Sequence, residues 1–161
     1  MASAPAPAFD LRQPSPGDER DVLAALGEWM PRDTVAALLP SAYLLRFAAT
    51  SLVARDQEGE VAGFLIAFPS SENPGVGYVH FVWVAPQARG RGLGRGLYSA
   101  AFGLLASAGC RMVEAVTSPQ NPGAVAFHAR LGFDRDRPRS GADIEPEPGV
   151  IVFTHPIGAP P

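Results

Sequence analysis

Residues 84–94 place a proline, two arginines and three glycines between an apolar run and an Ala/Leu-rich run. The apolar run predicts a strand, and the run that follows predicts a helix. Glycine lets a backbone approach a ligand closely, and the first N–H groups of a helix have no partner within that helix. With the positive end of the helix dipole, these donors favour a phosphate or a pyrophosphate. The segment therefore predicts an anion-binding turn between a strand and a helix.

Two common phosphate-binding motifs do not fit this turn. The Walker A pattern ends in Gly-Lys-Ser/Thr, and the chain has no lysine, since all 13 basic residues are arginines. The dinucleotide fingerprint needs G-x-G-x-x-G early in a βαβ unit. Here Gly90, Gly92, Gly94 and Gly96 alternate instead, and they lie late in the chain. Both motifs are excluded.

The rest of the chain predicts a mixed α+β fold, because strands precede helices in the middle and antiparallel strands stand at both ends. Apolar runs predict about seven strands, over residues 9–12, 51–55, 61–68, 78–85, 111–117, 133–135 and 150–154. Helical spacing and capping residues predict about four helices, over 19–26, 34–39, 92–108 and 122–131. The expected N-caps are Asp18, Asp33 and Asn121. Residues 56–60 predict a hairpin turn.

Length and charge restrict the function further. The 161 residues fit one domain over 1–161, with loose tails expected at 1–8 and 156–161. A net charge of −3 argues against a nucleic-acid partner. No apolar run approaches the roughly 20 residues of a membrane helix, and the first residues lack a signal-peptide pattern. We therefore expect a cytoplasmic protein without a membrane partner. No metal site is expected, and Cys110 is expected in the core.

Two motifs resemble one known family. The pattern Arg-x-x-Gly-x-Gly, formed by Arg89, Gly92 and Gly94, resembles the acyl-CoA pyrophosphate loop of the GNAT superfamily of N-acetyltransferases. Residues 121–133 contain Asn-x-x-Ala and end a helix in Leu-Gly-Phe, which resembles the second hallmark of that family. The resemblance implies a GNAT-like acyl-CoA N-acyltransferase fold. It also implies that the two central parallel strands, 78–85 and 111–117, splay apart.

The resemblance implies acetyl-CoA as the acyl donor. The pantetheine arm would use backbone groups that the splayed strands leave unpaired, and the N–H near Val82 would hold the thioester carbonyl oxygen. The arginines of the turn would face the CoA phosphates. The residues expected to contact CoA are Val82, Trp83, Val84, Arg89, Gly90, Arg91, Gly92, Leu93, Gly94, Arg95, Asn121, Ala124, Phe127 and His128.

Histidines are the candidate catalytic residues, because an ammonium must lose a proton before it can attack and imidazole titrates near neutral pH. His80 shares a strand face with Tyr78 and Val82, where the family often holds its general base. The alternatives are a packed core histidine and a histidine exposed at the start of a strand. His128 stands where the family usually has a tyrosine, proposed as the acid toward sulfur. A subgroup resembles this chain in having Phe-His before Leu-Gly-Phe. His128 could donate as an acid, contact the CoA backbone or have no chemical duty. His155 is expected at the surface.

The acceptor side is less specific. The resemblance implies an acceptor site at the helix pair near 26–40 and the loop between the last two strands. These regions contain the candidates Trp29 and Tyr43 and the acidic residues 143–147. Tyr78 is a further candidate. Glu114 is a second candidate base, a carboxylate that emerges at a sheet edge, or a carboxylate that pairs with an arginine. Aromatic rings and carboxylates would suit a cationic amine.

These expectations describe an acetyl-CoA-dependent N-acetyltransferase that transfers acetyl to an amine of a small molecule or peptide by direct attack in a ternary complex. A non-catalytic acyl-CoA-binding sensor or partner module is the alternative from another class. Transfer of a longer acyl group, and a homodimer, are left open.

Overall fold

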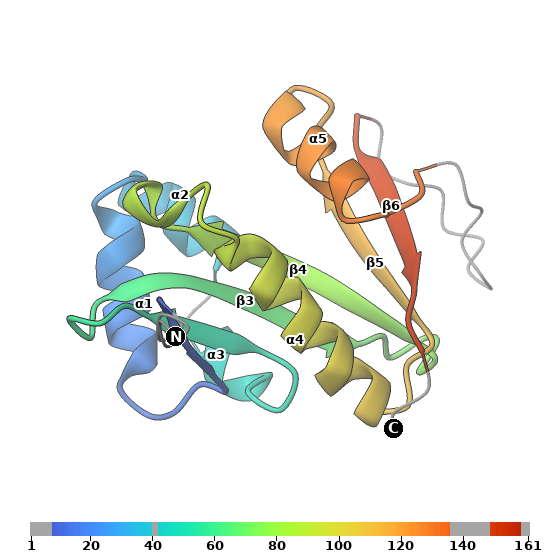
Figure 1. Cartoon of the computed structure of the whole chain (residues 1–161), viewed down its shortest axis with the longest axis horizontal. Helices are drawn as coiled ribbons and strands as arrows, with labels where there is room; N and C mark the ends of the chain where they lie inside the picture. The colour runs from blue at the N-terminus through green and yellow to red at the C-terminus, as the bar shows by residue number, and fades with distance from the viewer. Residues whose placement is uncertain (1–7, 40–41, 136–148, 159–161) are drawn as a thin grey trace, which may run out of the picture. The chain divides into compact units, whose positions relative to one another are not determined.

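The computed structural model describes residues 8–39, 42–135 and 149–158, and it has the predicted mixed α+β architecture (Figure 1). The described strands form one sheet in the order β1-β2-β3-β4-β5-β6. The strands are β1 (Asp10–Arg12), β2 (Leu52–Arg55), β3 (Val61–Pro69), β4 (Val76–Val84), β5 (Met112–Thr117) and β6 (Ile151–Pro156). The helices are α1 (Asp18–Gly27), α2 (Arg32–Leu38), α3 (Tyr43–Arg46), α4 (Leu93–Ser107) and α5 (Pro122–Arg130), with a 3-10 turn at Pro86–Ala88. None of the helices within these described ranges is long and apolar enough to cross a membrane.

The expected parallel pair of strands is confirmed. β4 pairs with β5 in parallel, from Val76 opposite Met112 to Val79 opposite Ala115. β4 then continues for five residues to Val84. β5 pairs with β6 in antiparallel register as far as Thr117 opposite Ile151. The predicted hairpin at 56–60 joins the antiparallel strands β2 and β3.

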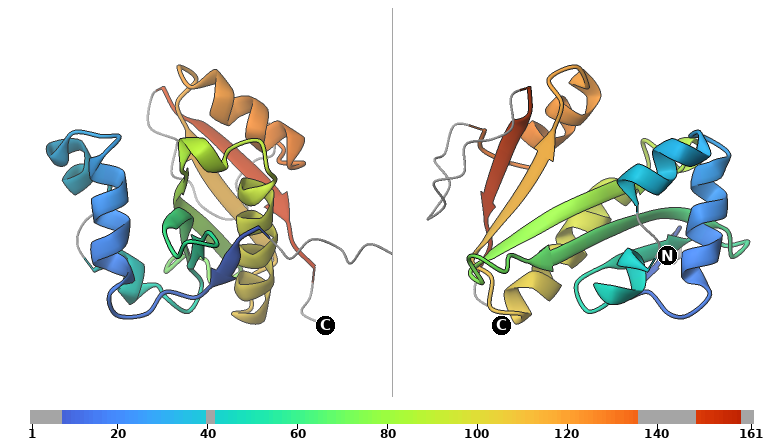
Figure 2. Two further views of the ribbon diagram at one scale, coloured as in Figure 1. Left: turned by 60° about the vertical axis from the view of Figure 1, so that its left-hand side comes forward. Right: turned by 180° about the vertical axis from the view of Figure 1, so that it is seen from behind.

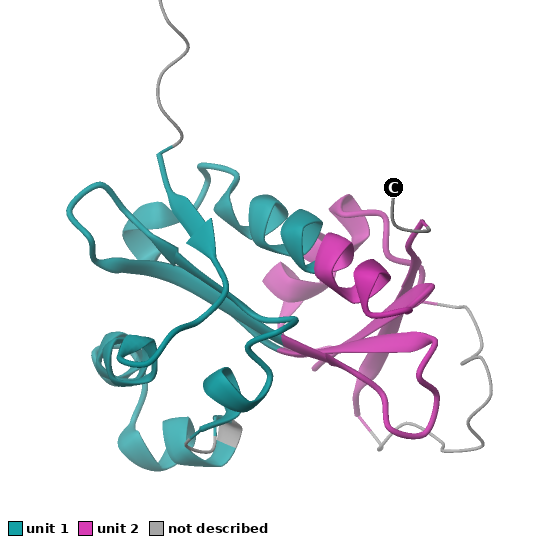
Figure 3. Ribbon diagram, turned by 90° about the horizontal axis from the view of Figure 1, so that it is seen from below, with its two compact units in different colours: residues 1–66, 81–101 teal, residues 67–80, 102–161 magenta. Residues whose placement is uncertain are grey.

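Two compact units make up the chain, and Figure 3 colours them separately. Unit 1 comprises residues 1–66 and 81–101, and unit 2 comprises 67–80 and 102–161. β3, β4 and α4 each contribute residues to both units. A single domain over 1–161 therefore stays a prediction, and the two units are described separately below.

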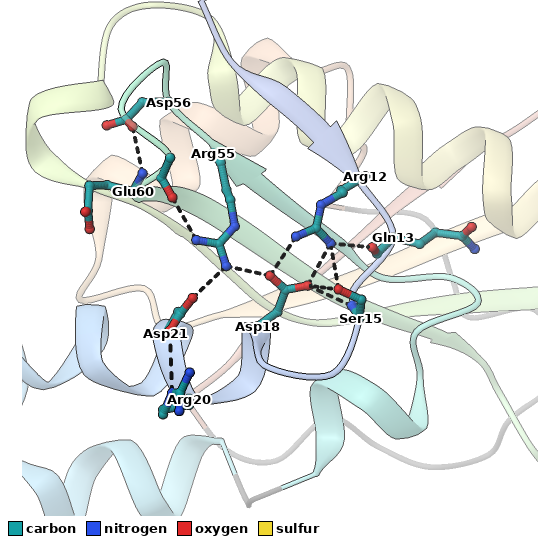
Figure 4. A network of polar contacts seen from close by, with 10 residues as sticks. Arg12, Gln13, Ser15, Asp18, Arg20, Asp21, Arg55, Asp56 and Glu60 are labelled. Atoms are coloured by element: carbon teal, nitrogen blue, oxygen red, sulfur yellow. Dashed lines mark hydrogen bonds and ion pairs between the residues drawn. The ribbon is translucent and has the colours of Figure 1, made fainter.

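A buried carboxylate organises unit 1 (Figure 4). The side chain of Asp18 is 1% exposed and lies 2.7 Å from the guanidinium of Arg12 and 2.6 Å from that of Arg55. It also accepts a 2.7 Å hydrogen bond from the backbone N–H of Ser15. Burial alone would raise the pKa of Asp18, but the bonds from Arg12, Arg55 and Ser15 hold it well below its ordinary value. One carboxylate thus ties together β1, β2 and the first turn of α1.

Two of the predicted helix N-caps are wrong. Asp18 does not cap α1, whose N-cap is Gly17 without a side-chain cap bond, because the carboxylate is engaged by two guanidinium groups. Asp33 does not cap α2 either, because that helix begins at Arg32, two residues before the predicted start, and its N-cap is Pro31. The short helix α3 was not predicted.

Helix α5 of unit 2 follows the sequence rules closely. The side-chain oxygen of Asn121 accepts a 3.1 Å hydrogen bond from the N–H of Ala124, and Pro122 occupies the first turn. The chain leaves the helix through Gly132, whose φ is +88°. The strand expected at 133–135 is only an isolated bridge between Asp134 and Thr154. Figures 1 and 2 show α5 alongside β5 and β6.

An aromatic layer forms the core between α5 and β6. The ring of His128 is buried; it stacks on Phe153 with centroids 4.9 Å apart and meets the edge of Phe133 at 5.3 Å. Its Nδ1–H donates a 2.8 Å hydrogen bond to the carbonyl of Ala124. Burial lowers the pKa of His128, and the bond to Ala124 opposes that shift only in part. The neutral imidazole is therefore the form that this core accommodates.

The end of the chain corrects two further predictions. His155 was expected at the surface, but it is half-buried in β6 and stacks on Phe102 at 4.9 Å. A loose tail was expected from residue 156. Instead Pro156 ends β6, and the buried Ile157 donates a 2.9 Å hydrogen bond to the carbonyl of Arg111. Apolar contacts and backbone pairing thus extend the fold to Ile157.

Replacing Asp18 by Asn is expected to lower the free energy of unfolding by about 3 kcal/mol, because the buried guanidinium contacts lose their counter-charge. The matched control is Asp21→Asn. Asp21 contacts the same Arg55 at 2.8 Å, but its side chain is 41% exposed. Its loss should cost about 0.5 kcal/mol. Urea unfolding followed by circular dichroism measures both variants, and equal costs would contradict the role given to Asp18.

Replacing His128 by Phe is expected to make unfolding less dependent on pH. In the unfolded chain the imidazole gains a proton below about pH 6.5, whereas the buried ring resists protonation. The unfolded state then binds more protons, so the stability of the natural protein falls as the pH decreases. Chemical denaturation measures the free energy of unfolding of both proteins at roughly pH 7.5 and roughly pH 5.5. Relative to the natural protein, the variant should be more stable at the lower pH than at the higher pH. A constant difference would contradict the burial argument, because His80 and His155 are common to both proteins.

Candidate functional site

The turn between β4 and α4 has the geometry of an anion-binding loop. β4 ends at Val84, the 3-10 turn follows, and α4 begins at Leu93. Gly90 has a φ of +71° and Gly92 a φ of +81°, which L side chains rarely adopt. A Cβ atom at either glycine would meet no atom within 4 Å. Glycine is therefore required here by backbone conformation, and the space beside the turn is open to a ligand.

The first turn of α4 supplies the donors. The N–H of Gly96 bonds to the carbonyl of Gly92 at 3.0 Å, which is the first turn of the helix ladder. The N–H groups of Leu93, Gly94 and Arg95 precede this bond, so they have no partner within the helix. No acidic side chain stands in this turn. Three backbone donors at a positive helix end suit an anionic group such as a phosphate.

The arginines of the turn differ in their contacts. The Nε–H of Arg89 donates a 3.1 Å hydrogen bond to the carbonyl of Val84, which links the loop to the end of β4. The guanidinium carbon of Arg91 lies 4.7 Å from the centroid of the Phe9 ring. Arg95 is exposed in the first turn of α4. All three carry positive charge at the start of the helix.

The last part of β4 is held in unit 1 by aromatic packing. The ring of Phe81 stacks on Phe64 at 5.5 Å, and the buried Trp83 lies 6.1 Å from the same ring. The carbonyl oxygen of Trp83 would be 2.8 Å from a Cβ on Gly63, so this glycine permits the close approach of β3. The indole of Trp83 is thus a core side chain, and only its backbone is suited to a ligand. Val82 and Val84 are partly exposed.

The predicted base lies in an aromatic group of unit 2. The partly exposed His80 has its ring centroid 6.4 Å from that of Tyr78 and 6.3 Å from that of Phe68. Glu114 on β5 is the register partner of Tyr78, so the two side chains share one face of the sheet. An imidazole, a phenol and a carboxylate of the predicted site therefore stand on the same face of unit 2.

The α5 candidates have structural contacts of their own. Asn121 uses its side-chain oxygen to cap the helix through the N–H of Ala124. The partly exposed Phe127 contacts the His128 ring edge-on at 5.7 Å. His128 itself is 4% exposed, and its lowered pKa disfavours the protonated form that a general acid requires. This packing favours the structural alternative for His128. The buried Cys110 is likewise a core residue, and burial raises the pKa of its thiol.

The helix pair at which the resemblance implied an acceptor site forms a groove in unit 1. Trp29 is 54% exposed after α1, and Tyr43 packs edge-on against Phe47 at 5.5 Å. The groove, of about 870 Å³, is lined by residues of α1 and of the α2 region, namely Leu23, Ala24, Gly27, Glu28, Arg32, Val35, Ala36 and Leu39. These individual lining residues could not be predicted from the sequence, because the residues that face each other across two helices depend on the angle between the helices. The acidic residues 143–147 lie outside the described residues.

Comparison with known proteins agrees with this geometry. The model of the Acetyltransferase (GNAT) family matches residues 19–133. Mycothiol acetyltransferase of Kineococcus radiotolerans is 34% identical over 141 residues, which is 85% of this chain and 46% of that protein. L-2,4-diaminobutyric acid acetyltransferase of Nocardia farcinica is 29% identical over 149 residues, covering 90% of this chain and 74% of that protein. The chain thus spans about half the length of the mycothiol acetyltransferase it matches.

Solved structures share the fold. The GNAT family N-acetyltransferase YhbS of Escherichia coli, solved in complex with CoA, has a TM-score of 0.71 at 24% identity, covering 98% of this chain and 86% of that chain. An acetyltransferase of the GNAT family from Streptococcus pneumoniae has a TM-score of 0.66 at 20% identity, and the match covers 93% of this chain and 99% of that chain. With the family match over more than half of its residues, the chain belongs to the Acetyltransferase (GNAT) family.

Proposed function

We propose that this protein is an acetyl-CoA-dependent N-acetyltransferase that acts on a primary amine of a small molecule. The observation that carries the proposal is the turn from β4 into α4, where Gly90 and Gly92 adopt positive φ beside three backbone donors. Membership of the family and the names of two relatives, both acetyltransferases, support it.

The donor would be held by backbone groups and by charge. The N–H groups of residues 93–95 and the guanidinium groups of the turn would bind the CoA phosphates. The β4–β5 ladder covers Val76–Val79, so the later residues Val82–Val84 would offer backbone groups to the pantetheine amides. The N–H of Val82 would donate to the thioester carbonyl oxygen as that oxygen gains charge. Acetyl-CoA supplies the acyl group and a thiol leaving group.

His80 would act as the general base. It would take the proton of the bound ammonium, directly or through a water, so that the amine nitrogen can attack the thioester carbon. The C–S bond then breaks, and the nitrogen loses a second proton, which the leaving thiolate would take up directly or through a water. An amide and free CoA are thus formed within one ternary complex. His128 would contribute packing, since burial disfavours its charged form.

Acceptor recognition would use the face of unit 2 that carries His80. The rings of Phe68 and Tyr78 lie 5.6 Å apart, and Glu114 is opposite Tyr78. Aromatic faces and a carboxylate attract a cation, so a protonated amine is the favoured acceptor class. That Trp29 and Tyr43 contact the acceptor stays a prediction from the sequence. A relative named for L-2,4-diaminobutyric acid makes a diamino acid the first acceptor to test.

Replacing Gly92 by Asp is expected to weaken CoA binding by at least about a hundredfold, through a strained φ and a carboxylate beside the phosphates. Gly92→Asn has the same backbone strain without the charge and should weaken binding less. Gly59→Asp is the matched stability control, because Gly59 has a φ of +84° and open space but lies in the β2–β3 hairpin. Calorimetric titration with CoA measures the three variants. Natural affinity in Gly92→Asp would refute the site.

Activity is tested by release of free thiol from acetyl-CoA in a panel of amines that includes L-2,4-diaminobutyric acid. We expect release above background hydrolysis with at least one primary amine. His80→Gln should then lower kcat by about a hundredfold, with CoA affinity unchanged, because general-base catalysis contributes on this scale.

His155→Gln is the control for that measurement, since His155 packs against Phe102 in unit 2 and has no proposed role in the reaction. Its activity per folded molecule should match the natural protein. Unchanged turnover in His80→Gln would remove His80 from the mechanism. CoA binding without thiol release from any amine would support the alternative, an acyl-CoA-binding module.

A further inference from the structure

Phe9, the residue before β1, contacts Arg91 in the turn between β4 and α4. The guanidinium of Arg91 lies over the ring of Phe9, with its carbon 4.7 Å from the ring centroid. Arg91 is exposed and Phe9 is half-buried, and 81 residues of chain separate them. Both residues belong to unit 1. A cation over the face of an aromatic ring is attracted by the negative charge of that face.

The position of Phe9 is fixed by the strand that follows it. β1 pairs with β2, with Asp10 opposite Arg55 and Leu11 opposite Ala54. A Cβ on Gly96 in α4 would lie 3.7 Å from the side chain of Leu11, so β1 lies against the start of α4. Arg12, the last residue of β1, is bound by the buried Asp18. Phe9 therefore reaches Arg91 from an anchored strand.

We propose that Phe9 is a positioning residue that holds Arg91 in place for a phosphate group of CoA, an inference that rests on the proposed function. The guanidinium carbon lies over the face of the Phe9 ring. An aromatic face attracts the cation but accepts no strong hydrogen bond, so the N–H donors of Arg91 are not used up by this contact. Phe9 therefore restricts where the guanidinium lies while its donors stay suited to a phosphate.

The physical gain is preorganisation. An exposed arginine has many rotamers, and ordering it on binding costs free energy. Phe9 reduces that cost before the ligand arrives. Arg89 is ordered differently, by its bond to the Val84 carbonyl, so the two arginines that flank Gly90 each have a fixed contact.

The test compares Phe9→Leu, which keeps an apolar side chain without a ring face, with Phe9→Trp, which keeps the ring face. Calorimetric titration with CoA should show affinity about two- to fivefold weaker in Phe9→Leu, and close to natural in Phe9→Trp. Arg91→Ala should weaken CoA binding about tenfold, the scale of a lost charge-assisted hydrogen bond. In the Arg91→Ala background, Phe9→Leu should cause no further loss, because the two residues act as one unit.

Titration with 3′-dephospho-CoA identifies the phosphate. If the loss caused by Arg91→Ala disappears with this ligand, Arg91 serves the 3′-phosphate; if the loss persists, it serves the pyrophosphate. Either result supports the proposal.

Two results would overturn it: natural affinity in Phe9→Leu, or an equal loss from Phe9→Leu with and without Arg91. Equal losses would mean that Phe9 acts only through the packing of β1. Failure of the proposed function is distinct: without a CoA site the natural protein would bind no CoA at all, and as a non-catalytic module it would bind CoA without releasing thiol, which these titrations do not measure.

Discussion

The carboxylate of Asp18 is the constraint on which unit 1 depends. A charged group that is 1% exposed loses most of its hydration, and it is tolerated only where hydrogen bonds and opposite charges replace the water. Here two guanidinium groups and the N–H of Ser15 do so. Because Arg12 is on β1 and Arg55 is on β2, the carboxylate fixes the edge of the sheet against the start of α1. Phe9 directly precedes β1 and contacts Arg91 in the turn between β4 and α4. The strand that Asp18 holds in place is therefore the strand that positions Phe9 beside the candidate donor site in unit 1.

Features governed by local chemistry could be predicted from the sequence. The glycines of the turn predicted an unusual backbone conformation, because a positive φ is costly for other residues. Gly90 and Gly92 both adopt a positive φ. Asn121 and Pro122 begin α5 because a side-chain acceptor and a missing N–H each suit a helix start. The β2–β3 hairpin followed from two apolar runs and the turn residues between them. In these cases the deciding contacts join residues a few positions apart. The parallel pair of β4 with β5 was implied instead by the resemblance to the GNAT superfamily.

Features governed by distant partners could not be predicted. A carboxylate before a helix is an ordinary cap signal, and only the fold brings Arg55, 37 residues away, close enough to engage Asp18 instead. His155 appeared to belong to a tail because proline follows it, yet Phe102 and Phe133 give it a place in the core. The contact of Arg91 with Phe9 is of the same kind. No spacing rule joins an arginine in a glycine-rich turn to an aromatic residue at the other end of the chain.

The burial of His128 changes the view of the proposed reaction more than any other observation. Where the resemblance implies a tyrosine, this chain has a buried imidazole whose pKa is lowered by burial, which disfavours the protonated form that an acid requires. The leaving group explains why this is tolerable. An ordinary thiol has a pKa of about 8.5, so a thiolate is a stable leaving group near neutral pH and needs little help from an acid. An ammonium, with a pKa of about 10, holds its proton firmly, so removal of that proton is where catalysis is needed. The demand for proton transfer therefore falls on the base, the role proposed for the partly exposed His80 rather than for the buried His128.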